Sequence, residues 1–205
     1  MFIPVPLNTT HMESPPKPNP SHAPPRLYLV IVNIQKLANV RALMMTAAAF
    51  GCYQVLLVGQ DRNSQRDMIN KHLEQALEQD IIKLERFSKW KECVDYLQQK
   101  SIFLIGVEID ETSKVLDDDY FQNNPYSSQT DIAIMMGNEG EGIHPKHLQE
   151  CQGLVRVPQY GVGTASFNVN VAATIVFYRF HKWKRTKNQE EGGKEEDKVK
   201  DQSMK

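Results

Sequence analysis

Short apolar runs rich in β-branched residues alternate with helical segments along this chain. Residues 27–32 (LYLVIV) predict a buried strand, and residues 53–59 (YQVLLVG) predict a second one. Between them, residues 40–48 place apolar side chains at helical spacing, with Asn39 as the expected N-cap and Gly51 as the expected stop. A strand, a helix and a strand in such a short stretch form a βαβ unit, whose strands must be parallel.

The alternation continues toward the C-terminus. Further helices are predicted at 65–79, 89–99 and 167–180, and further strands at 81–87, 101–107, 131–136 and 154–157. The last helix is apolar nearly all round, which predicts burial against more than one surface. The sequence therefore predicts an α/β fold with a mostly parallel sheet flanked by helices.

Proline and charge are concentrated at the two ends of the chain. Eight of the 11 prolines precede Arg26, and residues 182–205 carry eight basic and six acidic residues with almost nothing apolar. Such segments bury too little surface to offset their chain entropy. We therefore expect a disordered proline-rich arm at 1–26, a globular domain at 27–182 and a charged disordered tail at 183–205.

Composition excludes several classes of protein. No apolar run reaches the ~18 residues of a membrane span, and the N-terminus resembles neither a secretory nor an organelle leader. The three cysteines, Cys52, Cys93 and Cys151, form no CxxC, so we expect neither disulfides nor a metal site. A reducing compartment follows, cytoplasmic or nuclear, with organelles left open. The net charge of −1 excludes bulk electrostatic coating of nucleic acid, so RNA binding would need a local patch.

Two glycine-bearing segments directly follow predicted strands, residues 137–142 (GNEGEG) and 157–170 (VPQYGVGTASFNVN). Ligands of parallel sheets bind beyond the carboxyl ends of the strands, and glycines leave backbone N–H groups free to face them. Neither segment is a dinucleotide fingerprint or a P-loop. Taken alone, the first is equally typical of a surface turn, and Ser166 is typical of a helix N-cap. Asn168 and Asn170, however, begin an apolar helix, and buried amides need polar partners.

Together these features resemble a known family. Asn39 with its apolar helix, GNEGEGI at 137–143 and VPQYGVGTASFNVNVA at 157–172 resemble, in order, the three motifs of the SpoU-type (TrmH-like) RNA 2′-O-ribose methyltransferases. The resemblance covers residues 33–178, and SFNVNVA stands where the family usually has SLNVSVA. It implies a SPOUT fold, in which the C-terminal part of the sheet is threaded into a deep trefoil knot, a rare exception to ordinary chain connection.

The resemblance also implies a cofactor and partners. The family binds S-adenosylmethionine in the knot, methylates a ribose 2′-hydroxyl of tRNA or rRNA, and forms homodimers through the terminal helix. Its cofactor contacts correspond here to Val107, Gly137, Val157, Ser166 and Phe167.

Methyl transfer to a hydroxyl is an in-line displacement that depends on positioning and on stabilising the developing charge. The family's site residues correspond here to Asn39, Glu139 and Asn168, but its central arginine is replaced by Met45. Methionine can neither accept a proton usefully nor bind phosphate. Arg41 lies one turn earlier on the same helix face, and we hypothesise that it takes over; the alternative is a solvated first-turn residue.

Three functions compete. The leading one is an S-adenosylmethionine-dependent RNA 2′-O-ribose methyltransferase. The second is a catalytically degenerate member that binds cofactor or RNA without methylating, and the third, an unrelated nucleotide-binding enzyme, lacks the phosphate loop it would need. RNA contacts are expected from Arg41, from the shared surface of a dimer and from the basic stretch at 182–185, which is equally typical of a solvated helix end.

Overall fold

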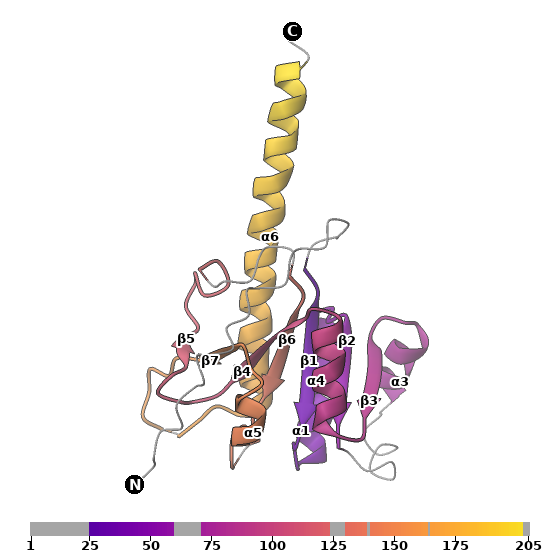
Figure 1. The fold of residues 1–205 in the computed structure, drawn as a ribbon, viewed down its shortest axis with the longest axis vertical. Coiled ribbons are helices and arrows are strands. Elements are labelled where there is room, and N and C mark those ends of the chain that lie inside the picture. Colours follow the sequence, from indigo (N-terminus) through magenta and orange to yellow (C-terminus); the bar gives the residue numbers. More distant parts are fainter. Residues whose placement is uncertain (1–24, 60–70, 124–129, 139, 164, 203–205) are drawn as a thin grey trace.

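One parallel sheet organises the molecule. The computed structural model describes residues 25–59, 71–123, 130–138, 140–163 and 165–202. Seven strands in this part of the chain pair in the order β3-β2-β1-β6-β4-β7-β5 (Figure 1). Every pairing is parallel. The strands are β1 (Leu27–Val32), β2 (Gln54–Val58), β3 (Lys83–Phe87), β4 (Phe103–Val107), β5 (Lys114–Val115), β6 (Ile132–Met136) and β7 (Gly153–Arg156).

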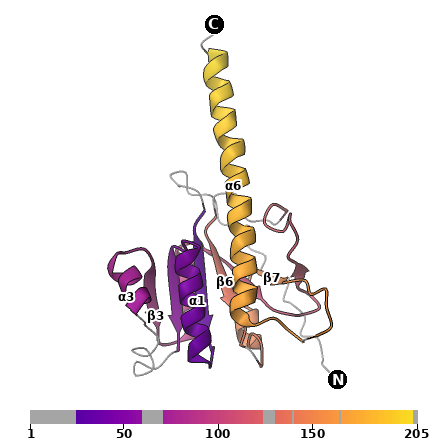
Figure 2. The ribbon, with the colours of Figure 1, turned by 180° about the vertical axis from the view of Figure 1, so that it is seen from behind.

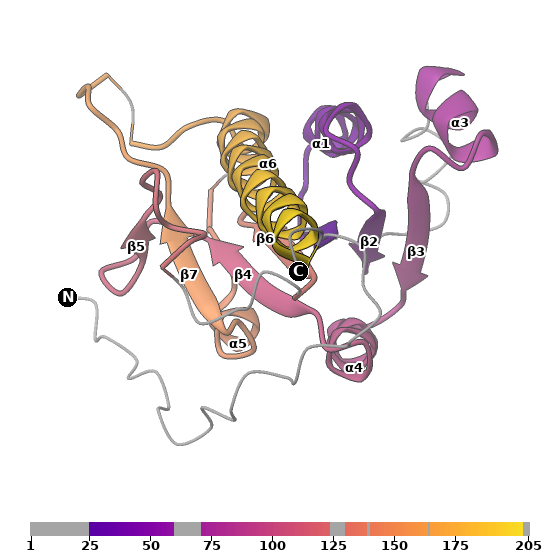
Figure 3. The same cartoon turned by 90° about the horizontal axis from the view of Figure 1, so that it is seen from above.

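Helices cover both faces of the sheet. They are α1 (Leu37–Ala49), α3 (Lys71–Glu78), α4 (Trp90–Gln99), α5 (Pro145–Leu148) and α6 (Val169–Gln202). Viewed from above, α1, α3 and α6 lie on one face, and α4 and α5 lie on the other (Figure 3). This confirms the predicted α/β architecture.

The sequence of β1 explains why the sheet is covered on both faces. Successive side chains of a strand point to opposite faces, and all six residues of β1 are buried. Leu29 and Ile31 join the core cluster that includes Phe177 of α6, whereas Val30 joins the cluster that includes Leu97 of α4. A continuous apolar run is therefore what this position in a parallel sheet demands.

The predicted elements are confirmed, but the first helix begins three residues earlier than expected and the last helix begins two residues later. The first helix begins at Leu37 with Lys36 as its N-cap, so Asn39 lies within the first turn. The last helix begins at Val169, and Asn168 caps its first turn by accepting from the Asn170 N–H, where Ser166 was expected as the cap. Both differences arise because the N-cap position is defined by local backbone geometry, which residue type alone does not fix. The helix expected at 65–79 is confirmed for Lys71–Glu78, and the rest of it lies outside the described residues.

Buried residues lie just outside both bounds of the domain expected at 27–182. Trp183 is only 6% exposed and packs on Phe121 and Phe180, with ring centroids 5.9 and 5.6 Å apart. Pro25 is buried, and the backbone N–H of Arg26 donates to Asp131 at 2.8 Å. The arm's residues 1–24 lie outside the described part.

The segment expected to be a disordered tail from 183 continues α6 to Gln202 (Figure 2). Its sequence favours a helix locally, because lysine and glutamate are good helix formers and Glu190 and Glu196 each precede a lysine by four residues. Within the described residues, no helix combines the length and the apolar character needed to cross a bilayer.

The order of the strands locates a crevice. The chain moves outward from β1 to β3 and then returns to build β4 beyond β6, so the winding direction reverses between β1 and β6. In open parallel sheets ligands bind at such a switch point, outside the carboxyl ends of the strands. Both glycine-bearing segments begin at this edge.

Candidate cofactor and catalytic site

Three of the predicted cofactor contacts gather at the carboxyl edge of the sheet. Val107 ends β4 and is in register with Met136 of β6 and with Val155 of β7. Gly137 directly follows β6, and Val157 directly follows β7. Because β6, β4 and β7 are neighbours, these positions lie side by side although they are spread over fifty residues of sequence.

The loop at 137–142 is shaped by its own asparagine. Asn138 and Gly142 exchange two backbone hydrogen bonds of 3.0 Å, and the Asn138 Oδ1 accepts from the N–H of Gly140 at 2.9 Å. The Asn138 Nδ2 also donates to the Asn33 carbonyl at 2.7 Å, which ties the loop to the end of β1. Gly142 has φ +70°, a conformation that favours glycine. These bonds tie the described residues of the loop to one another and to the end of β1.

Glu108, which the sequence did not point to, holds this loop by a hydrogen bond to its carboxylate. Its Oε2 accepts from the backbone N–H of Ile143 at 2.6 Å, and its Oε1 accepts from that of Ile109 at 2.9 Å. A Cβ on Gly137 or Gly142 would lie 2.8 or 2.4 Å from that Oε2. The two glycines therefore make room for the carboxylate. The signal in the sequence is its position directly after a buried strand, at the carboxyl ends of the strands.

The structure brings Asn39 and Asn168 together, although 129 residues separate them. The Asn168 Nδ2 donates to the Asn39 Oδ1 at 3.3 Å. The Asn168 Oδ1 accepts from the backbone N–H of Asn170 at 2.9 Å, so one side chain both caps α6 and contacts α1. Asn170 in turn accepts from the Thr46 hydroxyl at 2.8 Å and links the same two helices. Both amides thus have polar partners on α1, but Asn168 is exposed and Asn170 only half-buried, so the expected burial is wrong for Asn168.

The remaining predicted residues have separate positions. Arg41 and Met45 are both half-buried on α1, one turn apart, and Met45 packs against the core. Ser166 and Phe167 lie in the exposed segment before α6. Glu139 lies outside the described residues.

The cysteines take no part in this site. All three are free. Burial raises the pKa of the Cys93 thiol to about 12, and that of Cys151 to about 12, so both stay protonated and unreactive at neutral pH. Among the described residues, no three His, Cys, Asp or Glu side chains are grouped closely enough to hold a metal ion.

Comparison with known proteins identifies the family. Residues 26–178 match the model of the SpoU rRNA Methylase family, and the chain belongs to this family. It is 25% identical over 154 residues to the 23S rRNA (guanosine-2′-O-)-methyltransferase RlmB of Coxiella burnetii, covering 75% of this chain and 57% of that protein. It is 30% identical over 158 residues to the tRNA (guanosine(18)-2′-O)-methyltransferase TARBP1 of Mus musculus, covering 76% of this chain and 9% of that protein. The chain thus spans about half the length of the bacterial relative.

A solved structure shares the fold. The SpoU methyltransferase AviRb from Streptomyces viridochromogenes, in complex with AdoMet, superposes with a TM-score of 0.61 at 18% identity. The match covers 78% of this chain and 58% of that one. At this identity the likeness establishes the fold of the sheet and its helices.

Proposed function

We propose that this protein transfers a methyl group from S-adenosylmethionine to a ribose 2′-hydroxyl of tRNA or rRNA. The observation that carries the proposal is the contact between Asn39 and Asn168, two residues of the family's site that come from opposite ends of the domain. Membership of the SpoU family and the RNA 2′-O-methyltransferase relatives support the same activity. The AdoMet complex of AviRb supports the choice of cofactor.

The carboxyl edge of the sheet fits S-adenosylmethionine. Asn138 ties the described residues of the loop together, and Gly140 is exposed and carries no side chain, so a ligand can approach the main chain there. Glu108 adds a negative charge beneath the loop, which suits a cationic sulfonium. We assign cofactor binding to Gly137 and Val157 with Val107, and to Ser166 and Phe167 at the entrance to α6. When bound, the cofactor supplies an electrophilic methyl group.

The two asparagines act by positioning. Asn168 is fixed by its capping bond, so its amide nitrogen is held toward Asn39 without further ordering cost. Such preorganised dipoles orient the ribose and stabilise the charge that develops on its oxygen. Among the proposed catalytic residues, only Glu139 carries a group that accepts a proton near neutral pH, so we assign the hydroxyl proton to it.

A second function is kept open by Met45. Because the family's arginine is missing, a degenerate protein that binds cofactor or RNA without methylating is the specific alternative. Calorimetric titration with S-adenosylmethionine and transfer of its labelled methyl group to bulk cellular RNA separate the two. We expect both binding and transfer; binding without transfer would establish the alternative, and no binding at millimolar cofactor would contradict both.

Arg41 is expected to replace the missing arginine. Since Arg41 and Met45 lie one turn apart on the same face of α1, Arg41→Ala should lower methyl transfer at least about tenfold by removing a cation from the reacting centre. Met45→Arg added to that variant should restore activity, because it returns the cation to the usual position. Lys36→Ala is the matched control, an exposed cation at the start of α1. Full activity of Arg41→Ala would end the hypothesis.

We also propose that the C-terminal part of the sheet forms the family's trefoil knot. Support comes from the strand order, in which the late strand β7 lies next to β4, and from the shared fold of AviRb. A crystal structure traced continuously from 100 to 180 is the test. A chain in which 157–168 does not pass through the preceding loop would contradict the knot.

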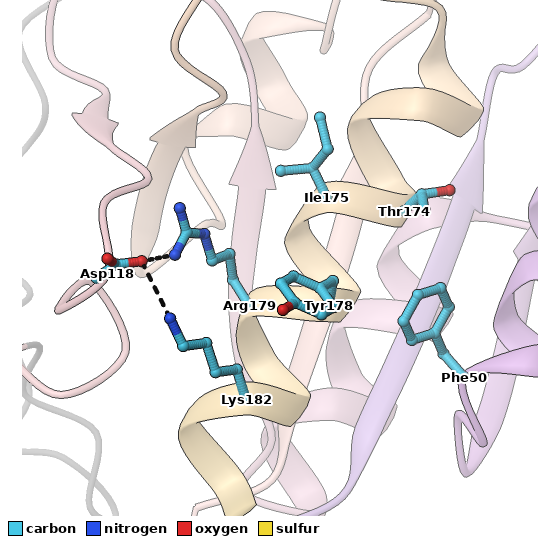
Figure 4. A pocket seen from close by; sticks show the side chains of 7 residues that line it. All are labelled: Phe50, Asp118, Thr174, Ile175, Tyr178, Arg179 and Lys182. Atoms are coloured by element: carbon cyan, nitrogen blue, oxygen red, sulfur yellow. Dashed lines mark ion pairs between the residues drawn. The ribbon is translucent and has the colours of Figure 1, made fainter. Parts of the chain in front are cut away.

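The outer face of α6 supports a homodimer. Val171, Ile175 and Tyr178 form one apolar stripe, in which Val171 is 45% and Tyr178 58% exposed. Beside it lies a groove of about 560 Å³ between α6, Phe50 and Asp118 (Figure 4). In a symmetric dimer, an apolar stripe of this kind is buried against the same stripe of the second chain. We propose that two chains pair through this face.

The dimer is expected to dissociate when Tyr178 is replaced by arginine. A cation at the centre of a desolvated interface costs several kcal/mol, so Tyr178→Arg should be monomeric at micromolar concentration by sedimentation velocity. Val115→Arg, a substitution of an exposed apolar residue on the edge strand β5, should remain dimeric. A monomeric wild-type protein, or a dimeric Tyr178→Arg variant, would rule out this interface.

A further inference from the structure

A second cavity lies at the amino ends of the strands, at the opposite end of the sheet from the glycine loops. It measures about 380 Å³ and is lined by residues that begin strands together with residues of α6. Leu27 begins β1 and Lys83 begins β3, whereas Val32 ends β1 near the candidate site. Six residues at about 3.3 Å each place the cavity roughly 20 Å from the carboxyl edge. The cavity is therefore not part of the site described above.

Cations from three separate elements converge in this cavity. Arg26 precedes β1, Lys83 begins β3 and Lys184 lies on α6. The Arg26 Cζ lies 4.3 Å and the Lys83 Nζ 5.2 Å from the centroid of the Tyr53 ring, so both cations lie against one aromatic ring. In the lining, Asp80 is the acidic residue, and its Oδ2 is 3.8 Å from the Lys83 Nζ. Positive charge is therefore in excess.

Two basic side chains of the cavity, Lys184 and His181, are partly buried, and burial disfavours their charged forms. Burial lowers the pKa of Lys184, and the like charge of Arg26 lowers it further, although Asp131 opposes the shift. Burial also lowers the pKa of His181, as does the neighbouring Lys184, although a hydrogen bond to the Phe50 backbone opposes the shift. The His181 Nε2 is buried and has no hydrogen-bond partner. A bound anion would offset the repulsion between the cations and stabilise their charged forms.

The surroundings favour a polyanion over a small one. Arg185 is exposed on α6 directly after Lys184, so positive charge continues along the helix beyond the cavity. A free phosphate would use the cavity alone, whereas a nucleic-acid backbone can reach both. A chain of net charge −1 must also concentrate its RNA contacts in such a local patch.

We propose that this cavity, the basal cavity, binds a backbone phosphate of the RNA substrate through Arg26, Lys83 and Lys184. The choice of RNA rests on the proposed function. The site anchors the RNA at a point remote from the reacting ribose, so it contributes to substrate affinity and not to the chemical step. It also gives Lys184, in the basic stretch at 182–185, a role that the sequence alone left open.

The test compares two double substitutions in the full chain, with fluorescently labelled bulk tRNA as the probe. Lys83→Gln with Lys184→Gln removes two charges from the basal cavity, and Lys91→Gln with Lys146→Gln removes two exposed charges from α4 and α5 on the other face. Binding is measured by anisotropy between 50 and 200 mM KCl. The cavity pair should bind about tenfold more weakly at the lower salt, with the slope of log Kobs against log salt shallower by roughly 1. The control pair should match the wild type, and Lys184→Arg, which keeps the charge, should bind as the wild type does.

Each outcome decides the proposal. Equal losses in the two pairs, or none in the cavity pair, would overturn the basal site while leaving the methyltransferase proposal intact. Inorganic phosphate at 10-fold excess over the probe, at constant ionic strength, should not displace the RNA; displacement would assign the cavity to free phosphate instead. In a methyl-transfer assay the cavity pair should raise KM with kcat unchanged, and a fall in kcat alone would contradict an anchoring role. A wild type that binds tRNA through the cavity but transfers no methyl group would refute the proposed function alone.

Discussion

Replacing Asn168 by aspartate is expected to lower methyl transfer by roughly 10²–10³-fold while leaving the stability of the protein nearly unchanged. Aspartate caps a helix as well as asparagine does, so the bond to the Asn170 N–H survives. What is lost is the amide donor that contacts Asn39, and a negative charge takes its place next to a developing alkoxide. Activity is measured as single-turnover transfer to bulk RNA, and stability by urea unfolding.

Thr46→Val is the matched control for this experiment. It breaks the hydrogen bond between Thr46 and Asn170, which joins the same two helices, and should cost about 1 kcal/mol of unfolding free energy. Its activity should stay close to that of the wild type because the Asn39–Asn168 contact remains. If Thr46→Val lost as much activity as Asn168→Asp, the contact between Asn39 and Asn168 would serve to hold α1 and α6 together and not to promote catalysis.

Gly142→Ala is expected to weaken S-adenosylmethionine binding at least about tenfold and to cost roughly 3–5 kcal/mol of unfolding free energy. Two causes combine. Alanine at φ +70° is strained, and its Cβ would lie 2.4 Å from the Glu108 Oε2. The carboxylate must then move and lose its 2.6 Å bond to the Ile143 N–H, which frees the loop. Cofactor titration and urea unfolding measure the two effects.

Gly59 separates these causes, because it has the same φ of +70° with no atom within 4 Å of its Cβ position. Gly59→Ala should therefore show the backbone strain alone, about 1–2 kcal/mol. In a Glu108→Ala background, Gly142→Ala should cost no more than Gly59→Ala, since the clash is gone. Equal costs of Gly142→Ala and Gly59→Ala in the wild-type background would show that Glu108 does not hold the loop.

The strands were more predictable than the ends of the helices. Each buried strand is a run of apolar residues, and this pattern marked β1, β2, β4 and β6 closely, because a strand covered on both faces must be apolar throughout. The basic residues on either side of Trp183 predict that it belongs to a charged tail. Its burial depends on Phe121, 62 residues away in the sequence, and no local pattern predicts such a contact.

The residues of the candidate site also differ in how well the sequence predicts them. Glycine and asparagine types at 137–142 and 157–170 were readable, because backbone approach and left-handed turns restrict the residues that fit. Glu108 was missed because a carboxylate after a strand is commonplace until the loop that it supports is known to lie above it. The pairing of Asn39 with Asn168 likewise required knowing that α1 and α6 lie side by side on one face of the sheet (Figure 2).

The sequence by itself determined the alternating α/β architecture, the parallel sheet and the family. Hydrophobic periodicity, the burial it predicts and the sequence motifs all depend on residues that are consecutive in the chain. The tertiary structure alone decided which side chains meet. It joined Glu108 to the glycine loop, Asn39 to Asn168, and Arg26 and Lys83 to Lys184 in the basal cavity. The physical reason is strand order: β1 lies between β2 and β6, and β4 between β6 and β7, so distant segments become neighbours only once the sheet is assembled.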